Sequence, residues 1–326
     1  MIVDGFNRVH DYLRISLTDN CNLRCTYCMP EEEYEFTPAS RLMQADEIEA
    51  IARIFVGLGV KKIRLTGGEP LVRKDAGLII QKLAGLAETL TMTTNATRVH
   101  EFIPRLKEAN VQSLNVSLDT LRSDRFILMT KRDLFDQVMA NIHLMIQEKI
   151  QVKVNAVIMK GVNDDEILDF IQWSRDTPIH IRFIEFMPFT GNKWDKERVM
   201  TWQEILERVS SKVDFAPLER KKHDTSKAYQ VPGYQGTFAV ISTMSSPFCG
   251  DCNRIRLTAD GKIKNCLFST TETDLLTPFR EGKDIVPLIL ANIHDKKEAL
   301  GGQFTTDLKN IDTEKIENRS MITIGG

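Results

Sequence analysis

The sequence predicts an α/β fold in which a partial (β/α)6 barrel is followed by a smaller C-terminal domain. Six short runs rich in β-branched residues alternate with helical or loop segments, an order typical of a parallel sheet. The chain carries no glycine-rich dinucleotide-binding fingerprint, which favours a barrel over a doubly wound sheet. The alternation fades after about residue 190, and the charged run at 218–227 is interpreted as a solvated connector. We therefore place the barrel at residues 1–215 and the C-terminal domain at 216–326.

The segments between the expected strands include helices with one buried face. In residues 45–58, Ile48, Ile51 and Phe55 share a face, and residues 165–176 repeat this spacing. A chain of 326 residues, 42% of them hydrophobic, is long enough to bury the core of one barrel with an appended piece. The six strands are expected at residues 12–17, 61–66, 90–94, 113–118, 152–158 and 180–186.

Charge and hydropathy exclude several classes of function. The formal net charge of −2 gives no basic field for nucleic acid or an anionic membrane. The N-terminal stretch carries charges where a secretory signal would be apolar, and no apolar run approaches the ~18 residues of a membrane span. We expect a cytoplasmic protein that binds neither nucleic acid nor membrane.

Polar residues recur on one face of the expected strands. Side chains at i and i+2 point to the same side of a strand, and an outer face should be covered by helices. A solvent-facing surface is the alternative, but in a βα order these residues are expected to line the barrel interior. A polar, cationic interior predicts a charged ligand. The pairs are Arg14 with Ser16, Arg64 with Thr66, Asn115 with Ser117 and Lys153 with Asn155, and Arg182 lies in the sixth strand.

The six cysteines form two triplets, Cys21, Cys25 and Cys28 near the start and Cys249, Cys252 and Cys266 near the end. Three disulfides are arithmetically possible, but a reducing compartment and the clustering favour metal binding. Three thiolates leave one coordination position open, where chemistry can occur. The first triplet follows the first strand, so it is expected at the C-terminal mouth of the barrel.

Spacing alone leaves other metal sites open. The first triplet could be a zinc site completed by a distant ligand such as His10. In the second triplet, two residues separate Cys249 from Cys252, and thirteen residues separate Cys252 from Cys266. This triplet could therefore be a zinc ribbon that lacks one ligand. It could equally be a second three-thiolate iron–sulfur cluster.

The first triplet, with Tyr27 before its third cysteine, resembles the signature of the radical S-adenosylmethionine (SAM) enzymes. In that family SAM chelates the open iron of a [4Fe-4S] cluster, and an electron from the cluster cleaves SAM to a 5′-deoxyadenosyl radical. The resemblance implies a TIM-like partial barrel whose open side is closed by the C-terminal domain. It also implies that SAM is contacted by Tyr27, Gly67, Gly68, Glu69, Ser117 and Met187.

The chain as a whole resembles the GTP 3′,8-cyclases of molybdenum cofactor biosynthesis, which are lyases. The resemblance runs from about residue 5 to Gly326 and rests on "RISLTD", "RLTGGEPL", "TTN", "NVSLD", "VKVNAVI", "IRFIEFMP", the second triplet and "IGG". It implies two [4Fe-4S] clusters, the second of which binds guanine. In the family the adenosyl radical removes the ribose 3′ hydrogen of GTP, the resulting radical attacks guanine C8, and reduction gives 3′,8-cyclo-7,8-dihydro-GTP.

The same resemblance assigns the cations and the C-terminus. The Gly325-Gly326 tail is expected to reach the active site near arginines. An electron donor and a downstream cyclic pyranopterin monophosphate synthase are implied as partners, for a monomer or a homodimer. GTP is expected to be held by Arg14, Arg64, Thr93, Lys153, Arg182, Arg254 and Arg256.

Two positions depart from the family pattern, and two other functions stay open. Asn20 stands where relatives usually have arginine, and Ala96 stands where a glycine is common. A radical SAM enzyme acting on a peptide is one alternative, although a peptide gives no reason for six interior cations. A non-catalytic iron–sulfur carrier is the other, although fully ligated clusters suit electron transfer better.

Overall fold

The computed structural model describes residues 1–29, 34–304, 311 and 316–325. Its strands form one sheet in the order β12-β11-β10-β1-β2-β3-β4-β5-β6-β9-β8-β7. The strands are β1 (Tyr12–Ser16), β2 (Lys62–Thr66), β3 (Thr89–Thr94), β4 (Ser113–Ser117), β5 (Gln151–Ile158), β6 (His180–Glu185), β7 (Ala216–Pro217), β8 (Lys227–Gln230), β9 (Thr237–Ile241), β10 (Arg254–Leu257), β11 (Lys262–Lys264) and β12 (Thr273–Asp274).

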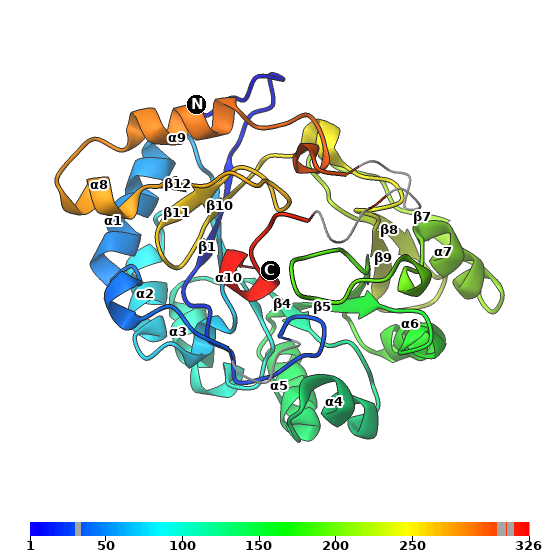
Figure 1. Ribbon diagram of the computed structural model, residues 1–326. Coiled ribbons are helices and arrows are strands. Elements are labelled where there is room, and N and C mark those ends of the chain that lie inside the picture. Colours follow the sequence, from blue (N-terminus) through cyan, green and yellow to red (C-terminus); the bar gives the residue numbers. More distant parts are fainter. Residues whose placement is uncertain (30–33, 305–310, 312–315, 326) are drawn as a thin grey trace.

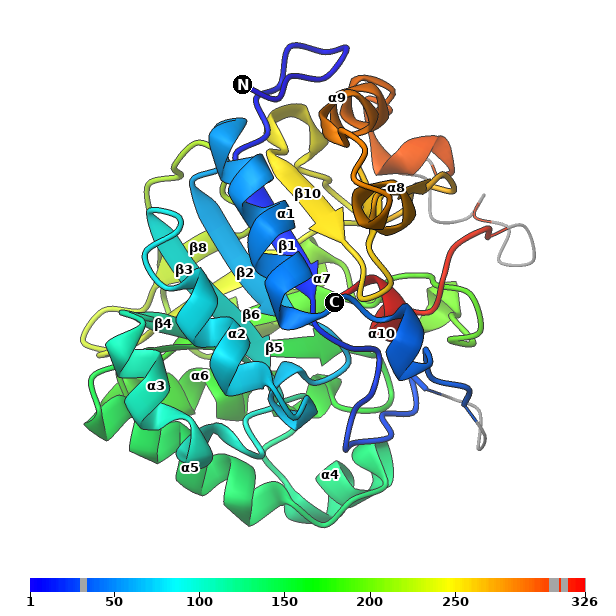
Figure 2. The same ribbon diagram turned by 90° about the vertical axis from the view of Figure 1, so that its left-hand side faces the viewer.

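Helices cover the convex face of this curved sheet, as Figure 2 shows for α1, α2, α3 and α5. The short α10 lies instead near the centre of the concave side (Figure 1). The helices are α1 (Ala45–Gly57), α2 (Ala76–Leu83), α3 (Ile103–Glu108), α4 (Ser123–Thr130), α5 (Phe135–Gln147), α6 (Ile167–Asp176), α7 (Trp202–Ser210), α8 (Leu276–Arg280), α9 (Val286–His294) and α10 (Met321–Ile324).

The predicted six-stranded partial barrel is confirmed, because β1 to β6 are parallel neighbours in chain order. The expected strand bounds agree with the observed ones within one residue. The buried faces of the helices pack on the sheet, with Phe55, Phe170 and Phe183 fully buried in this layer. The sheet stays open, since β12 and β7 end the strand order rather than pairing with each other.

The C-terminal part adds two parallel strands that the sequence pattern did not reveal. β10 pairs in parallel with β1, and β9 pairs in parallel with β6. One sheet therefore contains strands from both sides of the predicted domain boundary between residues 215 and 216. The division into two domains stays a prediction. β10 is only four residues long, too short to show a clear alternation.

The charged run at 218–227 is only partly a solvated connector. Residues 218–222 are exposed, whereas residues 222–226 line the central cavity and Lys227 begins β8. Charge alone could not show this, because a loop at a cavity mouth is hydrated like any other loop.

Among the described residues, no helix combines the length and the hydropathy that crossing a bilayer requires.

Candidate active site

A cavity of about 750 Å³ fills the concave side of the barrel and is lined by all six cysteines. It reaches from Thr66, Thr93 and Ser117, at the C-terminal ends of their strands, to Lys62 and Thr89 at the N-terminal ends. This volume is at the upper end of the range for small-molecule sites. The two triplets, far apart in the sequence, thus face the same space.

The first triplet lies on the loop after β1, at the mouth predicted from the sequence. The backbone N–H groups of Arg24 and Thr26 donate to carbonyls at the end of α4, which fixes the loop. Burial and the nearby Glu69 raise the pKa of the Cys21 thiol to about 11. Burial, the neighbouring thiols and Asp119 raise the pKa of the Cys25 thiol well above its usual value. Buried thiols that oppose one another's ionisation need a bound cation to become thiolates, which is what a metal cluster supplies.

The structure shows why glycine is required at positions 67 and 68, which the sequence pattern did not specify. Both line the cavity, and a Cβ on either would collide with the backbone of residues 18–20, which leads into the cysteine loop. Gly67 also has φ +153°. The glycines therefore let the end of β2 lie against the loop that carries the first triplet.

Glu69 lies apart from the other residues predicted to contact SAM. Its carboxylate is 1% exposed and accepts hydrogen bonds from Thr94 Oγ1 (2.8 Å) and the backbone N–H of Asn95 (2.6 Å) and Leu71 (3.0 Å). It is absent from the cavity lining, whereas Tyr27, Ser117 and Met187 are part of it. Burial raises the pKa of Glu69 to about 7, although these hydrogen bonds oppose the shift.

The second triplet is built differently, with cations at its sulfurs. Lys296 Nζ lies 3.4 Å and Arg254 Nη2 3.6 Å from Cys252 Sγ. Burial raises the pKa of Cys252, but these two cations outweigh it and lower the pKa to about 6. Arg8 holds the same loop, donating to the Cys249 carbonyl oxygen at 2.8 Å. Cys252 is therefore a thiolate at neutral pH.

Strand register gathers the predicted cations into two rows across the sheet. Arg256, Arg14 and Arg64 are successive register partners on β10, β1 and β2. One pleat nearer the strand starts, Arg254 and Lys62 flank Tyr12 in the same way. Since residues two apart share a face, both rows point into the cavity.

These cations are crowded and partly without counterparts. Burial and the neighbouring Arg182 lower the pKa of Lys153 to about 8, and burial and Arg64 lower that of Arg182 to about 9. In the part of the chain that the structure describes, Arg182 Nε and Nη2 are buried donors without a hydrogen-bond partner. Buried polar groups are normally paired, so the cavity fits a polyanionic ligand that would supply the missing partners.

Sequence analysis missed three residues that line the cavity near these cations, although the two-residue spacing along each strand would have found them. Lys62, Tyr12 and His180 each lie two positions before a predicted cation, on the same strand face. The Lys62 ammonium lies 4.8 Å from the centre of the Tyr12 ring. Thr93, predicted to contact GTP, accepts a 3.3 Å hydrogen bond from Arg64 Nη1.

The remaining predicted residues also have defined places. Arg256 donates to the Gly325 carbonyl oxygen, which brings the described end of the tail to one arginine. Gly326 lies outside the described residues. Ala96, which departs from the family pattern, has φ +62°, the region that favours glycine. The Asn20 carbonyl accepts from the N–H of Glu69 at 2.8 Å.

Within the described residues, no three His, Cys, Asp or Glu side chains surround a single ion. All six cysteines are free thiols. A cubane cluster binds each cysteine through a different iron, so its ligands need not converge on one point. Each half-buried three-thiol set on the cavity is thus compatible with a cubane cluster.

Comparison with known proteins places this site in a family. Residues 15–174 match the model of the radical SAM superfamily, and residues 179–301 match that of Molybdenum Cofactor Synthesis C. The barrel and its three-cysteine loop thus define a radical SAM enzyme, which uses SAM and a [4Fe-4S] cluster.

Curated relatives specify the family further. The chain is 44% identical to the mitochondrial GTP 3′,8-cyclase of Arabidopsis thaliana over 100% of its own length and 84% of the relative's. It is 41% identical to the GTP 3′,8-cyclase of Thermodesulfovibrio yellowstonii over 99% of both chains. The chain therefore belongs to the GTP 3′,8-cyclase family.

A further relative agrees with this placement, and a solved structure shares the fold. Molybdenum cofactor biosynthesis protein 1 of Mus musculus is 43% identical over 99% of this chain, which spans only 51% of that relative. Streptococcus suis SuiB, solved bound to its precursor peptide, shares the fold with a TM-score of 0.66 at 17% identity, over 91% of this chain and 66% of SuiB.

Proposed function

We propose that this chain converts GTP to 3′,8-cyclo-7,8-dihydro-GTP in molybdenum cofactor biosynthesis, using SAM and two [4Fe-4S] clusters. The observation that carries the proposal is the placement of two three-cysteine sets on one cationic cavity. Cys21, Cys25 and Cys28 hold the SAM cluster. Cys249, Cys252 and Cys266, which line the same cavity, would hold the second cluster.

The bound SAM cluster supplies the electron that cleaves SAM to the hydrogen-abstracting 5′-deoxyadenosyl radical. The chain's own residues position the reactants. Gly67, Gly68, Ser117, Tyr27 and Met187 line the SAM end of the cavity. Glu69 acts from behind this wall by fixing the ends of β2 and β3.

The cationic rows bind the triphosphate of GTP. Guanidinium groups match phosphate oxygens in bidentate geometry, and the unpartnered atoms of Arg182 lie in the same cavity. Arg14, Arg64, Lys153, Arg254 and Arg256 share this task, with Thr93 contributing a hydroxyl. Holding the ribose and the base in one dry chamber orients C3′ toward C8 and excludes competing hydrogen donors.

The wider assignments follow from the same reaction. An external reductant has to supply electrons, and the product is passed to a cyclic pyranopterin monophosphate synthase. The enzyme acts as a monomer or a homodimer.

The decisive experiment is an anaerobic assay of the reconstituted protein with SAM, dithionite and GTP, analysed by mass spectrometry. We expect 5′-deoxyadenosine together with a product isomeric with GTP, and ATP in place of GTP as the matched control should give no isomer. Deoxyadenosine without a GTP isomer would retain the radical SAM chemistry and remove GTP as the substrate. A peptide-modifying enzyme would behave in that way.

A further inference from the structure

The C-terminal segment, residues 316–325, forms part of the cavity wall. Met321 and Ile322 of α10 line the cavity, and Ile322 is 5% exposed. Ile324 is 1% exposed and packs with Phe268 and Leu300 in an apolar cluster that also contacts Cys249 and Cys266. The segment is therefore docked beside the second triplet.

The tip of this segment fits its place closely. Gly325 has φ +72°, and a Cβ there would collide with Thr66 Oγ1. Arg256 Nη1 donates to the carbonyl oxygen of Gly325 and lies 3.5 Å from that of Ile324. The tip thus needs a defined position along the chain, because a shift that brought Ile324 into the place of Gly325 would put a side chain against Thr66.

An ion-pair cluster six residues before the tip can set that position. Arg319 Nη1 and Nη2 lie 2.9 Å from the two carboxylate oxygens of Asp260, and Nη2 lies 2.6 Å from Glu272 Oε2. Asp260 is in the turn between β10 and β11, and Thr258 Oγ1 orients it through a 2.6 Å hydrogen bond. The Arg319, Asp260 and Glu272 side chains are only 26%, 20% and 13% exposed, so solvent screens them less than a surface pair.

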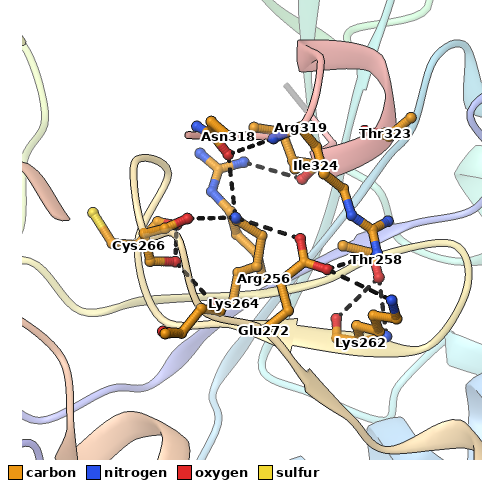
Figure 3. A network of polar contacts seen from close by, with 12 residues as sticks. Arg256, Thr258, Lys262, Lys264, Cys266, Glu272, Asn318, Arg319, Thr323 and Ile324 are labelled. Atoms are coloured by element: carbon orange, nitrogen blue, oxygen red, sulfur yellow. Dashed lines mark hydrogen bonds and ion pairs between the residues drawn. The ribbon is translucent and has the colours of Figure 1, made fainter. Parts of the chain in front are cut away.

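A buried lysine connects the same segment to the loop that carries Cys266. Lys264 is 1% exposed, and its Nζ donates to the Ser269 carbonyl at 2.7 Å and to Asn318 Oδ1 at 3.2 Å. Asn318 Nδ2 donates to the Leu267 carbonyl at 2.8 Å. Figure 3 shows Lys264 between Glu272, Asn318 and the Cys266 loop. A buried ammonium needs such a complete set of acceptors, so Asn318 is held where the lysine requires it.

We propose that Arg319 is a positioning residue that clamps the C-terminal segment to the β10–β11 turn and to Glu272, and so delivers Gly325 to Arg256. We call Arg319, Asp260 and Glu272 the tail clamp. The bidentate pair fixes both the distance and the direction of the chain, and Lys264 reinforces it through Asn318. Arg256 is a proposed phosphate ligand, so this part of the inference rests on the proposed function; the docking itself does not.

Hydrogen–deuterium exchange of the anaerobically reconstituted full chain, without GTP, tests the clamp. The amide N–H of Asn318 donates to Thr190 Oγ1 at 3.1 Å and reports docking, whereas that of Thr323 donates to the Ser320 carbonyl at 3.1 Å and reports formation of α10 at the docked tip. Arg319→Gln should accelerate exchange across 316–325 by roughly tenfold or more. Asp260→Asn should do the same, and Arg319→Lys should give a smaller increase because lysine lacks the planar fork.

A matched control and a second variant separate the clamp from general destabilisation. Arg53→Gln removes a surface arginine–carboxylate pair, Arg53 with Glu49 on α1, and should leave the tail unchanged. Gly325→Ala should accelerate exchange at Thr323 while Asn318 stays protected by the clamp.

The clamp is overturned if Arg319→Gln leaves tail exchange unchanged, or if exchange rises equally in the central strand β5. It is also overturned if Gly325→Ala alone releases Asn318. Failure of the GTP assay would leave these exchange results unaffected, so the two proposals fail separately.

Discussion

The two cysteine triplets lie on the same cavity but in opposite electrostatic surroundings. At the first triplet, burial and the nearby Asp119 and Glu69 raise the thiol pKa values. At the second, Arg254 and Lys296 lower the pKa of Cys252 to about 6. The first triplet therefore has carboxyl groups as its charged neighbours, whereas the second has cations.

This difference matches the charges of the two proposed ligands. SAM is a sulfonium cation and suits an end that carries carboxylates, while the triphosphate of GTP suits the end with guanidinium groups. Electrostatics alone thus favours one orientation of the two reactants in the chamber. The comparison teaches that two sets of three cysteines can have different charged surroundings within one cavity.

Removing one cysteine from each triplet should separate the two roles most strongly. Cys25→Ala and Cys252→Ala should each reduce iron content from about eight to about four atoms per chain. Cys25→Ala should lower deoxyadenosine formation by about a thousandfold or more, whereas Cys252→Ala should keep slow SAM cleavage without making a GTP isomer. Iron analysis and mass spectrometry measure both effects. Retained SAM cleavage in Cys25→Ala would contradict the assignment of the first triplet.

Arg182→Ala should weaken GTP binding without affecting SAM. The lost charge-assisted hydrogen bonds predict a roughly 10- to 100-fold higher Kd for GTP. Calorimetry on the reconstituted, unreduced protein measures both affinities. Arg53→Ala, which removes a 61% exposed arginine from α1, is the control. An unchanged Kd for GTP would place the triphosphate away from Arg182.

Local pattern carried much of the prediction of this fold and site. The β-branched runs identified β1 to β6, and two-residue spacing identified the cations of β1, β2 and β5, because parallel register places equal positions side by side. The same spacing could have added Lys62. Long-range pairing was not predictable from local pattern. β10 pairs with β1 across more than two hundred residues of sequence, and Arg319 contacts Asp260, which lies 59 residues earlier in the chain.

The effect of Lys296 on Cys252 is a further long-range contact, and it sharpens the contrast between the triplets. In the metal-free protein at pH 7, Cys252 should be the first of the six cysteines alkylated by iodoacetamide, because only thiolates react rapidly. Its rate should rise with pH around 6, where the thiol ionises. Lys296→Met should move this midpoint upward by about one pH unit or more.

Peptide mapping after timed alkylation measures the midpoint. Lys297→Met, which removes the neighbouring exposed lysine, is the matched control and should leave the profile in place. Faster alkylation of Cys28 than of Cys252 at pH 7 would show that the cations do not set the difference.

The smallest effect is expected at the N-terminal segment, where Arg8 holds the Cys249 loop of the second triplet. Burial and the nearby Lys296 lower the pKa of His10 to about 4, although Asp4 opposes this. His10 is therefore neutral at pH 7, and its Nε2 and Asp4 Oδ2, 3.0 Å apart, form a hydrogen bond rather than an ion pair. Its buried Nδ1 has no partner among the described residues, so a second proton would be unsatisfied there. Arg8, which holds the Cys249 loop, binds the same carboxylate at 2.6 Å.

The sign of the pH dependence follows from these pKa values. Between pH 6.5 and 4 the unfolded chain protonates His10 but the folded chain does not, so stability falls as the pH falls. Burial raises the pKa of Asp4, but its hydrogen bonds lower it to about 2, so its stabilisation is present above about 4 and is lost between about 4 and 2. Of these two groups only the histidine contributes at pH 5, by about 1–2 kcal/mol relative to pH 7.

Urea unfolding of the metal-free protein at pH 7 and pH 5 measures this contribution. Glu69, with its raised pKa, contributes to the same pH range with the opposite sign, so the contribution of His10 is the difference between the wild type and His10→Gln. His143→Gln, which changes an exposed histidine, should leave the pH dependence unchanged. An identical pH slope in His10→Gln would mean that the anchor of the second triplet does not titrate in this range.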